Sequence, residues 1–196
     1  MPIFLLARHA HSVLNLQERV NGDPTVDVPL TEQGSEQARL LGAQLAHIEL
    51  DLCVHTRFPR TRATAELATA RRDVPLDVEP LLDDVDIGEL EGWEIGRYRE
   101  VKRSLGRKRP FPGGESLDDA ARRYALGFER VVERGVNRGL VICHEIPVRY
   151  ALNAAAGSDT LDGPPFHEIP NAVPFLFEGD ALGEAAARIR TLAESG

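Results

Sequence analysis

Three short apolar segments of the chain each lead into a histidine. Residues 3–7 are followed by Arg8 and His9, residues 52–54 by His55, and residues 139–143 by His144. A neutral imidazole is a good nucleophile near pH 7, since its unperturbed pKa is about 6.5. An arginine beside it supplies a planar fork that binds phosphoryl oxygens. A histidine at one strand end is usually an ordinary surface or hydrogen-bonded residue, but three such ends together indicate a site.

Side chains of this kind need elements that bring the segment ends together. Apolar runs predict strands over 3–7, 52–54, 76–78, 139–143 and 173–177, and helices are expected over 31–48, 58–70, 116–133, 146–156 and 184–193. Thr31 and Ser116 are natural N-caps, because a hydroxyl accepts a free backbone N–H. Alternating strands and helices predict an α/β fold, a three-layer α/β/α sandwich with a mostly parallel central sheet. Reactive groups gather at the strand ends of such a sheet.

The length of 196 residues suits one domain that spans 1–196. Residues 81–114 are less regular, contain several glycines and prolines, and include the short basic run Lys102–Arg109. We expect this segment to form an excursion or lid embedded in the domain.

The composition excludes some functions. The net charge is −8 and there is no basic tract, so the chain is a poor general binder of nucleic acid. No apolar stretch approaches membrane-spanning length, and the apolar start of the chain is too short for a signal peptide. We therefore expect a cytoplasmic protein without a membrane partner. Cys53 and Cys143 lie in apolar runs and are expected to be reduced core thiols.

Six segments in a fixed order resemble the motifs of the histidine phosphatase superfamily, also called the phosphoglycerate mutase-like family. The matching segments are Arg8–Asn15, Gly22 with Asp27–Gly34, Thr56–Ala65, Leu82–Gly92, Pro112–Ser116 and Val141–His144. An Arg-His pair alone is common, whereas six ordered segments over about residues 3–175 are specific. The resemblance implies a phosphoglycerate mutase-like fold and transfer of a phosphoryl group.

The resemblance also implies a role for each matching residue. His9 corresponds to the nucleophile that becomes phosphohistidine, and His144 to the second histidine, which helps to hold the phosphoryl group. Arg8, Asn15 and Arg60 correspond to phosphate-binding residues. Asp84 occupies the position of the carboxylic acid that protonates the leaving group, with Asp83 and Asp86 as alternatives. No metal and no cofactor is expected, because these groups supply the positive field.

Several residues depart from the motifs near the expected pocket. Ala10 replaces a glycine and would crowd the loop if that position needs a positive φ. His11, His55 and Glu145 also differ from the usual residues, and we expect these three to tune substrate choice. The alternative for Glu145 is that it stabilises the start of the following helix.

The resemblance leaves the reaction open among three functions. We predict a metal-independent phosphatase that acts on a small phosphorylated metabolite, because the lid over 81–114 is short for shielding phosphohistidine from water. A phosphoglycerate mutase-type phosphomutase is the first alternative, and a non-catalytic phosphate-binding regulatory module is the second. The sequence does not decide whether the chain forms a homodimer.

Overall fold

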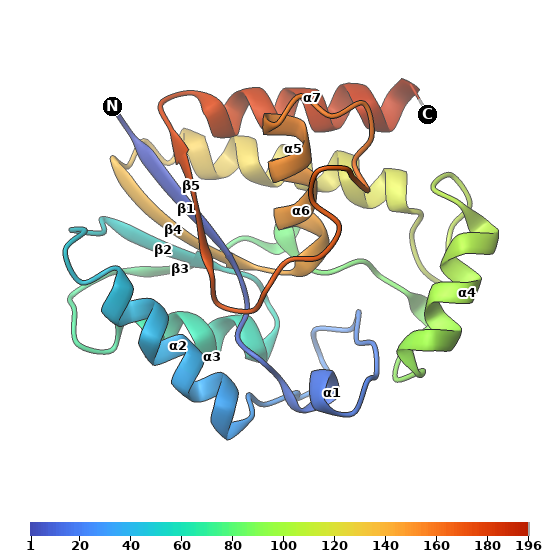
Figure 1. Ribbon diagram of the computed structural model, residues 1–196, viewed down its shortest axis with the longest axis horizontal. Coiled ribbons are helices and arrows are strands. Elements are labelled where there is room, and N and C mark those ends of the chain that lie inside the picture. Colours follow the sequence, from blue (N-terminus) through green and yellow to red (C-terminus); the bar gives the residue numbers. More distant parts are fainter. Residues whose placement is uncertain (196) are drawn as a thin grey trace.

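A single five-stranded sheet lies at the centre of the computed structural model, which describes residues 1–195 (Figure 1). The strands are β1 (Ile3–Arg8), β2 (Leu52–His55), β3 (Leu76–Val78), β4 (Arg138–Cys143) and β5 (Pro174–Glu178), in the order β3-β2-β4-β1-β5. The pairs β1–β4, β4–β2 and β2–β3 are parallel, and only the edge strand β5 is antiparallel to its neighbour. The predicted mostly parallel sheet is thus confirmed.

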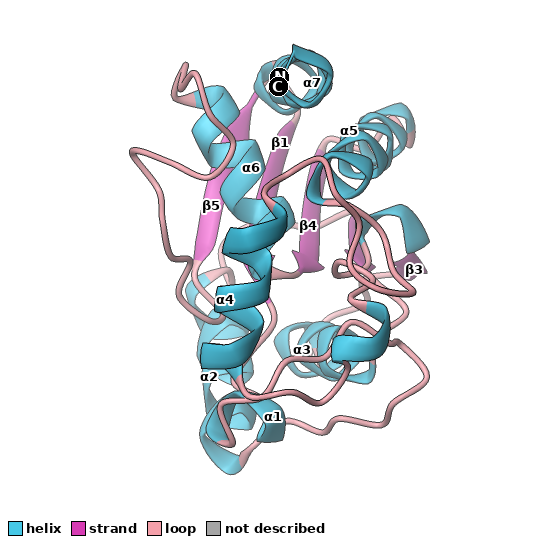
Figure 2. Cartoon of the chain, turned by 90° about the vertical axis from the view of Figure 1, so that its right-hand side faces the viewer, coloured by secondary structure: helices cyan, strands magenta, loops and turns pink. Residues whose placement is uncertain are grey.

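Helices cover both faces of the sheet, as the view in Figure 2 shows. One face carries α2 (Glu32–Gln44) and α3 (Pro59–Thr69), and the other carries α5 (Leu117–Glu133), α6 (Glu145–Ala155) and α7 (Ala181–Ser195). Each face has its own buried core: Leu41 and Leu140 belong to the first, and Phe4 and Phe128 to the second. The predicted three-layer α/β/α sandwich is therefore confirmed.

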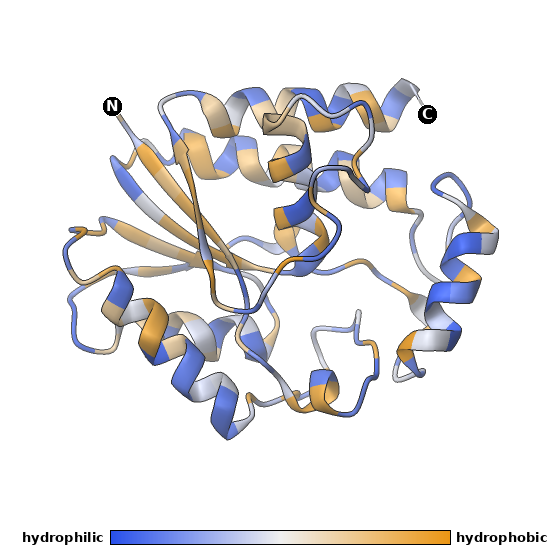
Figure 3. Cartoon of the chain, viewed as in Figure 1, coloured by the Kyte–Doolittle hydropathy of each residue, from blue (hydrophilic) through white to orange (hydrophobic). Residues whose placement is uncertain are grey.

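The central strands are apolar because both of their faces are covered. Residues 139–143 of β4 are all buried, and the strands form the apolar centre of the molecule in Figure 3. Both cysteines are free thiols in this buried part of the sheet, Cys53 in β2 and Cys143 in β4. The edge strand β3 differs, since all three of its residues are exposed.

The two predicted N-caps begin their helices as expected. The Thr31 hydroxyl accepts from the Gly34 N–H at the start of α2, and Ser116 forms a capping box with Asp119 at the start of α5. The helix expected over 31–48 ends earlier than the sequence predicts. Helix α2 stops at Gln44, so Ile48 packs against the core from the following turn.

The segment 81–114 is more regular than its sequence indicates. It contains the two short helices η1 (Pro80–Leu82) and η2 (Gly88–Leu90), and the eleven-residue helix α4 (Ile95–Leu105). The basic run thus begins on a helix. None of the residues of α4 is fully buried, and the helix lies to one side of the sandwich in Figure 1. Another short helix, α1 (Val13–Leu16), follows the end of β1. Within residues 1–195, no helix is long and apolar enough to cross a membrane.

Candidate active site

His9 follows the last residue of β1 and is held in one tautomer by its neighbours. Its Nδ1 lies 2.8 Å from the carbonyl oxygen of Ala10, which can only accept a hydrogen bond. The Nε of Arg60, which can only donate, lies 3.0 Å from Nε2. The proton is therefore on Nδ1, and Nε2 carries a lone pair. Burial, followed by the charges of Arg60 and Arg8, holds the pKa of His9 well below its usual range, so the ring is a neutral nucleophile.

Arg60, the second residue of α3, connects the functional side chains. Its Nη2 lies 3.2 Å from Asp84 Oδ2 and 3.2 Å from His144 Nδ1, and its Nη1 donates to the Oδ1 of Asn21. Burial lowers the pKa of Arg60 to about 10, against the opposing effect of the Asp84 carboxylate. The guanidinium thus remains charged at neutral pH.

Asp84 and His144 face each other across Arg60. The Oδ2 of Asp84 lies 3.4 Å from His144 Nδ1. Burial raises the pKa of Asp84, although Arg60 opposes the shift, and a raised pKa is what a proton donor needs. Burial and the charge of Arg60 hold the pKa of His144 well below its usual range. His144 caps α6, is fully buried, and lies with its ring centre 5.5 Å from that of His9.

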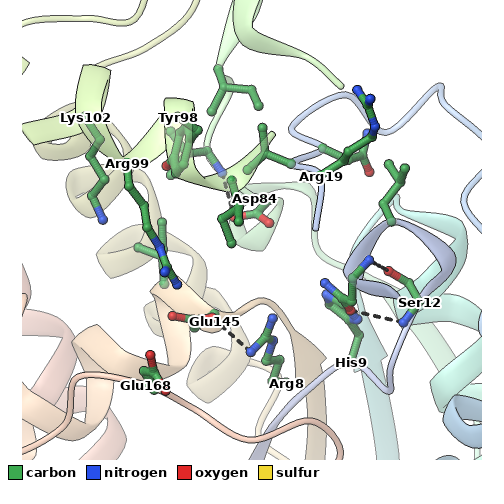
Figure 4. A pocket seen from close by; sticks show the side chains of 18 of the residues that line it. Arg8, His9, Ser12, Arg19, Asp84, Tyr98, Arg99, Lys102, Glu145 and Glu168 are labelled. Atoms are coloured by element: carbon green, nitrogen blue, oxygen red, sulfur yellow. Dashed lines mark hydrogen bonds and ion pairs between the residues drawn. The ribbon is translucent and has the colours of Figure 1, made fainter. Parts of the chain in front are cut away.

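Arg8 is shared between the site and the residue that departs from the motif, Glu145. Its Nη1 donates to the carbonyl oxygen of Ile169 at 2.8 Å and lies 2.9 Å from Glu145 Oε2 (Figure 4). The other carboxylate oxygen of Glu145 lies 3.4 Å from Arg149 Nη1. Glu145 is also the first residue of α6, so both the pocket role and the helix role fit its position.

Asn15 is oriented by the short helix α1. Ser12 caps this helix, and its backbone N–H donates to Asn15 Oδ1 at 3.0 Å. The amide oxygen is therefore occupied. Within residues 1–195, the Nδ2 group makes no hydrogen bond to the protein and remains available to an anion.

These side chains surround one cavity of about 340 Å³ beneath α4. Arg8, His9, Asn15, Arg60 and Asp84 line its floor, and His144 lies buried behind them. Tyr98, Arg99 and Lys102 extend into it from α4 (Figure 4). The volume is in the range of small-molecule sites. The structure thus brings the predicted residues of the site together, while their catalytic roles stay predictions.

Two of the predicted tuning residues lie elsewhere. His11 points toward the start of α2, where its Nδ1 lies 3.1 Å from the Thr31 hydroxyl. The Nδ1 of His55 lies 2.7 Å from the carbonyl oxygen of Thr56, and the side chain is buried. Neither residue lines the cavity, and the expectation that the two histidines tune substrate choice stays a prediction. Of the three, only Glu145 lines the cavity.

The structure also places the alternative acids and the basic run relative to the cavity. Asp83 binds the Nε of Arg57 at 2.6 Å, and Asp86 caps Gly88 at the surface. Neither lines the cavity, so Asp84 is the one of these three aspartates that does, and its role as the acid stays a prediction. Of the basic run, Lys102 reaches the cavity, whereas Arg107 pairs with Asp118 at 2.8 Å.

Ala10 fits its position without strain. It is buried, it does not adopt a positive φ, and its N–H donates to the Thr64 hydroxyl at 3.0 Å. The expected crowding by its methyl group therefore does not arise from backbone conformation.

The sequence reasoning missed three residues that position the site. Asn21 holds Arg60 through its side-chain and backbone oxygens. Glu91 accepts from Asn21 Nδ2 at 2.8 Å and from the N–H groups of Gly22 and Asp23 at 2.7 and 3.1 Å. Asn171 donates to the carbonyl oxygen of His9 at 2.7 Å. Glu91 belongs to a matching segment, so its position was a usable signal.

The arrangement agrees with the comparison to protein families. Residues 4–180 match the sequence profile of the histidine phosphatase superfamily (branch 1). The chain belongs to this superfamily. A 2,3-bisphosphoglycerate-dependent phosphoglycerate mutase 2 of Gloeobacter violaceus is 33% identical over 93% of the chain and 88% of that protein. A phosphoserine phosphatase 1 of Hydrogenobacter thermophilus is 29% identical over 79% of the chain and 76% of that protein.

Solved structures agree with the fold of the superfamily. The Bacillus stearothermophilus protein YhfR superposes with a TM-score of 0.79 at 23% identity and covers 91% of both chains. The α-ribazole phosphatase of Shigella flexneri superposes with a TM-score of 0.80 at 18% identity and covers 90% of both chains. At these identities the likeness shows the fold alone. The relatives identified by sequence carry the names of both mutases and phosphatases.

Proposed function

We propose that this chain is a metal-independent phosphatase that hydrolyses small phosphate monoesters through a phosphohistidine on His9. The observation that carries the proposal is the orientation of His9. Its Nδ1–H is tied to the Ala10 carbonyl, and its Nε2 lone pair faces Arg60 beside Asp84. A neutral nucleophile, fixed cations and a carboxyl whose pKa burial raises are the groups that this phosphoryl transfer requires in one cavity.

In the first step, His9 Nε2 attacks phosphorus and the bond from phosphorus to the ester oxygen breaks. Arg8, Arg60 and Asn15 hold the three phosphoryl oxygens, whose charge is present throughout the transfer. The carboxyl proton of Asp84 goes to the leaving oxygen. The products of this step are an alcohol, phosphohistidine and an Asp84 carboxylate.

In the second step, water attacks phosphorus and the bond from phosphorus to Nε2 breaks. The Asp84 carboxylate takes a proton from this water, which restores the acid for the next cycle. Inorganic phosphate then leaves, and the lone pair of His9 Nε2 returns.

The phosphatase reaction is favoured over the mutase reaction by the form of the lid. No residue of α4 is fully buried, and Arg19, Arg99 and Glu168 at the cavity are exposed. Such a lid gives water access to the phosphohistidine. The mutase alternative is supported by the names of relatives such as the Gloeobacter violaceus protein.

The first experiment measures hydrolysis of p-nitrophenyl phosphate with and without EDTA. We expect turnover that EDTA does not reduce, and a loss of at least about a thousandfold in kcat in His9→Asn. His47→Asn is the matched control, because His47 is an exposed imidazole in the turn after α2, outside the cavity, and should leave kcat unchanged. Full turnover by His9→Asn would sink the proposal, and binding of phosphate without turnover in the parent protein would favour the regulatory module.

A second experiment separates the phosphatase from the mutase. The phosphoenzyme, identified by its acid lability, is formed in the native protein and then mixed with 3-phosphoglycerate. A phosphatase passes the group to water at a rate that this acceptor does not change. Rapid formation of a bisphosphorylated product would instead establish the mutase reaction.

A further inference from the structure

The Nε2 edge of the His144 ring contacts a short row of hydroxyl groups. Thr56 follows β2, and Thr61 lies in the first turn of α3. The Nε2 of His144 lies 2.9 Å from Thr56 Oγ1, which lies 2.8 Å from Thr61 Oγ1. Thr61 Oγ1 in turn lies 2.8 Å from the carbonyl oxygen of Phe58. Both threonines are 1% exposed or less, so water does not substitute for these contacts.

The direction of this row is fixed at its far end. A carbonyl oxygen can only accept, so the Thr61 hydroxyl donates to Phe58. A hydroxyl has one hydrogen, and the oxygen of Thr61 must therefore accept from Thr56. The hydrogen of Thr56 is thus used as well, and its oxygen can only accept the Nε2–H of His144.

The contact at the other ring nitrogen, Nδ1, is consistent with this direction. Arg60 Nη2, which is only a donor, lies 3.2 Å from His144 Nδ1. The neutral ring therefore carries its proton on Nε2 and presents a lone pair at Nδ1. This is the nitrogen on the side of His9 and Asp84, where the phosphoryl group is expected.

On the basis of the proposed function, we propose that Thr56 and Thr61 are positioning residues that fix His144 as its Nε2–H tautomer, so that it can donate to a phosphoryl oxygen only as an imidazolium. A lone pair at Nδ1 repels an anionic oxygen. Contact requires that Nδ1 gains a proton, either from solvent or from the hydroxyl of a monoanionic ester, whose O–H bond breaks as the N–H bond forms. Phosphoryl binding is then coupled to protonation of one imidazole.

The charged surroundings of His144 oppose this protonation. Arg60 on α3 and the ring of His9 face His144, and the charges of Arg8 and Arg123 also act on it. The Asp84 carboxyl is the acidic group beside Nδ1. Burial and these cations hold the pKa of His144 well below its usual range. A bound dianion supplies the negative charge that favours the imidazolium.

The tautomer can be measured without any assay of activity. The nitrogen NMR shifts of the six histidines distinguish a protonated ring nitrogen from one with a lone pair, and a His144→Asn spectrum assigns the signals of this ring. We expect Nε2–H in the free protein. A free protein with Nδ1–H would overturn the proposal, whatever the enzyme hydrolyses.

The role of the hydroxyl row is tested by a matched pair of variants. Thr61→Val keeps the shape and removes the hydroxyl, which frees the Thr56 hydrogen to donate to Nε2. Thr61→Ser keeps the hydroxyl. We expect Thr61→Val to populate the Nδ1–H tautomer and Thr61→Ser to retain Nε2–H. An unchanged tautomer in Thr61→Val would contradict the proposal.

Binding of sulfate tests the coupled proton. Sulfate is a dianion with no ionisable proton near neutral pH, so proton uptake during its calorimetric titration in buffers of different ionisation enthalpy comes from the protein. We expect uptake of about one proton and an affinity that weakens by up to about tenfold per pH unit as pH rises. Thr61→Val should reduce both, and Thr61→Ser should restore them. Equal uptake in all three proteins would reject the role of the threonines, whereas a failure of the proposed function would appear as absent ester turnover with the tautomer intact.

Discussion

Arg60 has a different task at each of its nitrogens. Its Nε reaches the nucleophile, its Nη1 reaches Asn21, and its Nη2 reaches both Asp84 and His144. Each of these nitrogens thus has a partner within the protein. An entering phosphoryl group must replace some of these contacts, so its oxygens take over hydrogen bonds that already point toward the nucleophile.

The position of Asp84 predicts an effect that depends on the leaving group. Asp84→Asn cannot donate a proton, so kcat/KM for an alkyl phosphate should fall by about 10²- to 10⁴-fold. Hydrolysis of p-nitrophenyl phosphate should fall much less, because nitrophenolate leaves without a proton. Steady-state kinetics on both esters measure the difference.

The same residue predicts the alkaline limb of the pH profile. Burial raises the pKa of Asp84, and activity should decline as pH rises through that pKa. Asp84→Asn should lack this limb. Asp86→Asn is the control, since Asp86 lies outside the cavity and should affect both esters equally. A parallel loss on both esters in Asp84→Asn would contradict its role as the acid.

Glu145 predicts an effect on product binding. Its carboxylate forms an ion pair with Arg8, so its negative charge lies beside the expected position of the phosphate. Glu145→Gln should therefore lower the inhibition constant of inorganic phosphate by about tenfold. Glu168→Gln removes an equal charge from the exposed rim of the same cavity and should change it much less. Equal or weaker phosphate inhibition in Glu145→Gln would show that the ion pair does not compete.

At the scale of elements, a loop and a short helix turn hold the arginine. Glu91, the residue after η2, accepts three hydrogen bonds from residues 21–23, and Asn21 in turn accepts from Arg60. The loop has no regular structure of its own to fix it. Its conformation therefore depends on a carboxylate that is 70 residues distant in sequence from Asn21.

This arrangement predicts a loss at a distance from the chemistry. Glu91→Ala should release the loop and reduce kcat/KM by about 10- to 100-fold, while circular dichroism shows the fold retained. Glu89→Ala is the matched control from the same short helix, because Glu89 is exposed. Wild-type kinetics in Glu91→Ala would mean that Arg60 is held in place without the loop.

Some elements could be predicted because their causes are local. Apolar runs located the strands, and the hydroxyls of Thr31 and Ser116 located two helix starts. The residues of the site followed from strand ends and ordered motifs. Helix α4 could not be predicted in this way, because its residues are mostly polar, none is fully buried, and Glu94 gives it no side-chain cap.

Other features depend on contacts that the sequence does not display. His11 and His55 are close in sequence to residues of the expected pocket. Their rings instead contact the Thr31 hydroxyl and the Thr56 carbonyl oxygen, outside the cavity. The antiparallel direction of β5 depends on the path of residues 157–173, which contain no helix or strand. The hydrogen bond of Asn171 to His9 spans 162 residues.

At the scale of the molecule, the cavity and the whole chain have opposite charge. The chain carries a net charge of −8. The cavity is lined by more cations than acids: Arg8, Arg19, Arg60, Arg99, Lys102 and Arg149 against Asp84, Glu145 and Glu168. A local positive field inside an acidic shell attracts dianions, and dissolved salt screens this attraction.

The charge pattern predicts a salt dependence of substrate binding. KM for a dianionic ester should rise with ionic strength, while kcat stays nearly constant. Lys102→Gln should raise KM at low salt and flatten this dependence, because Lys102 extends into the cavity. Arg103→Gln, an exposed cation on the same helix outside the cavity, is the control. A KM that is independent of salt would contradict electrostatic attraction.

The two buried thiols make the opening of the sheet observable. Burial raises the pKa of Cys53 to about 12 and that of Cys143 further, so neither forms a reactive thiolate in the folded chain. They lie on adjacent strands, with Cys143 in the middle of the sheet. Cys53 belongs to the core beneath α2 and α3, and Cys143 to the core on the opposite face of the sheet. If the sandwich opens as one unit, a thiol reagent should modify both at one common rate. Unequal rates would mean that one helical layer leaves the sheet while the other still covers it, and the faster thiol would identify the face that unfolds first.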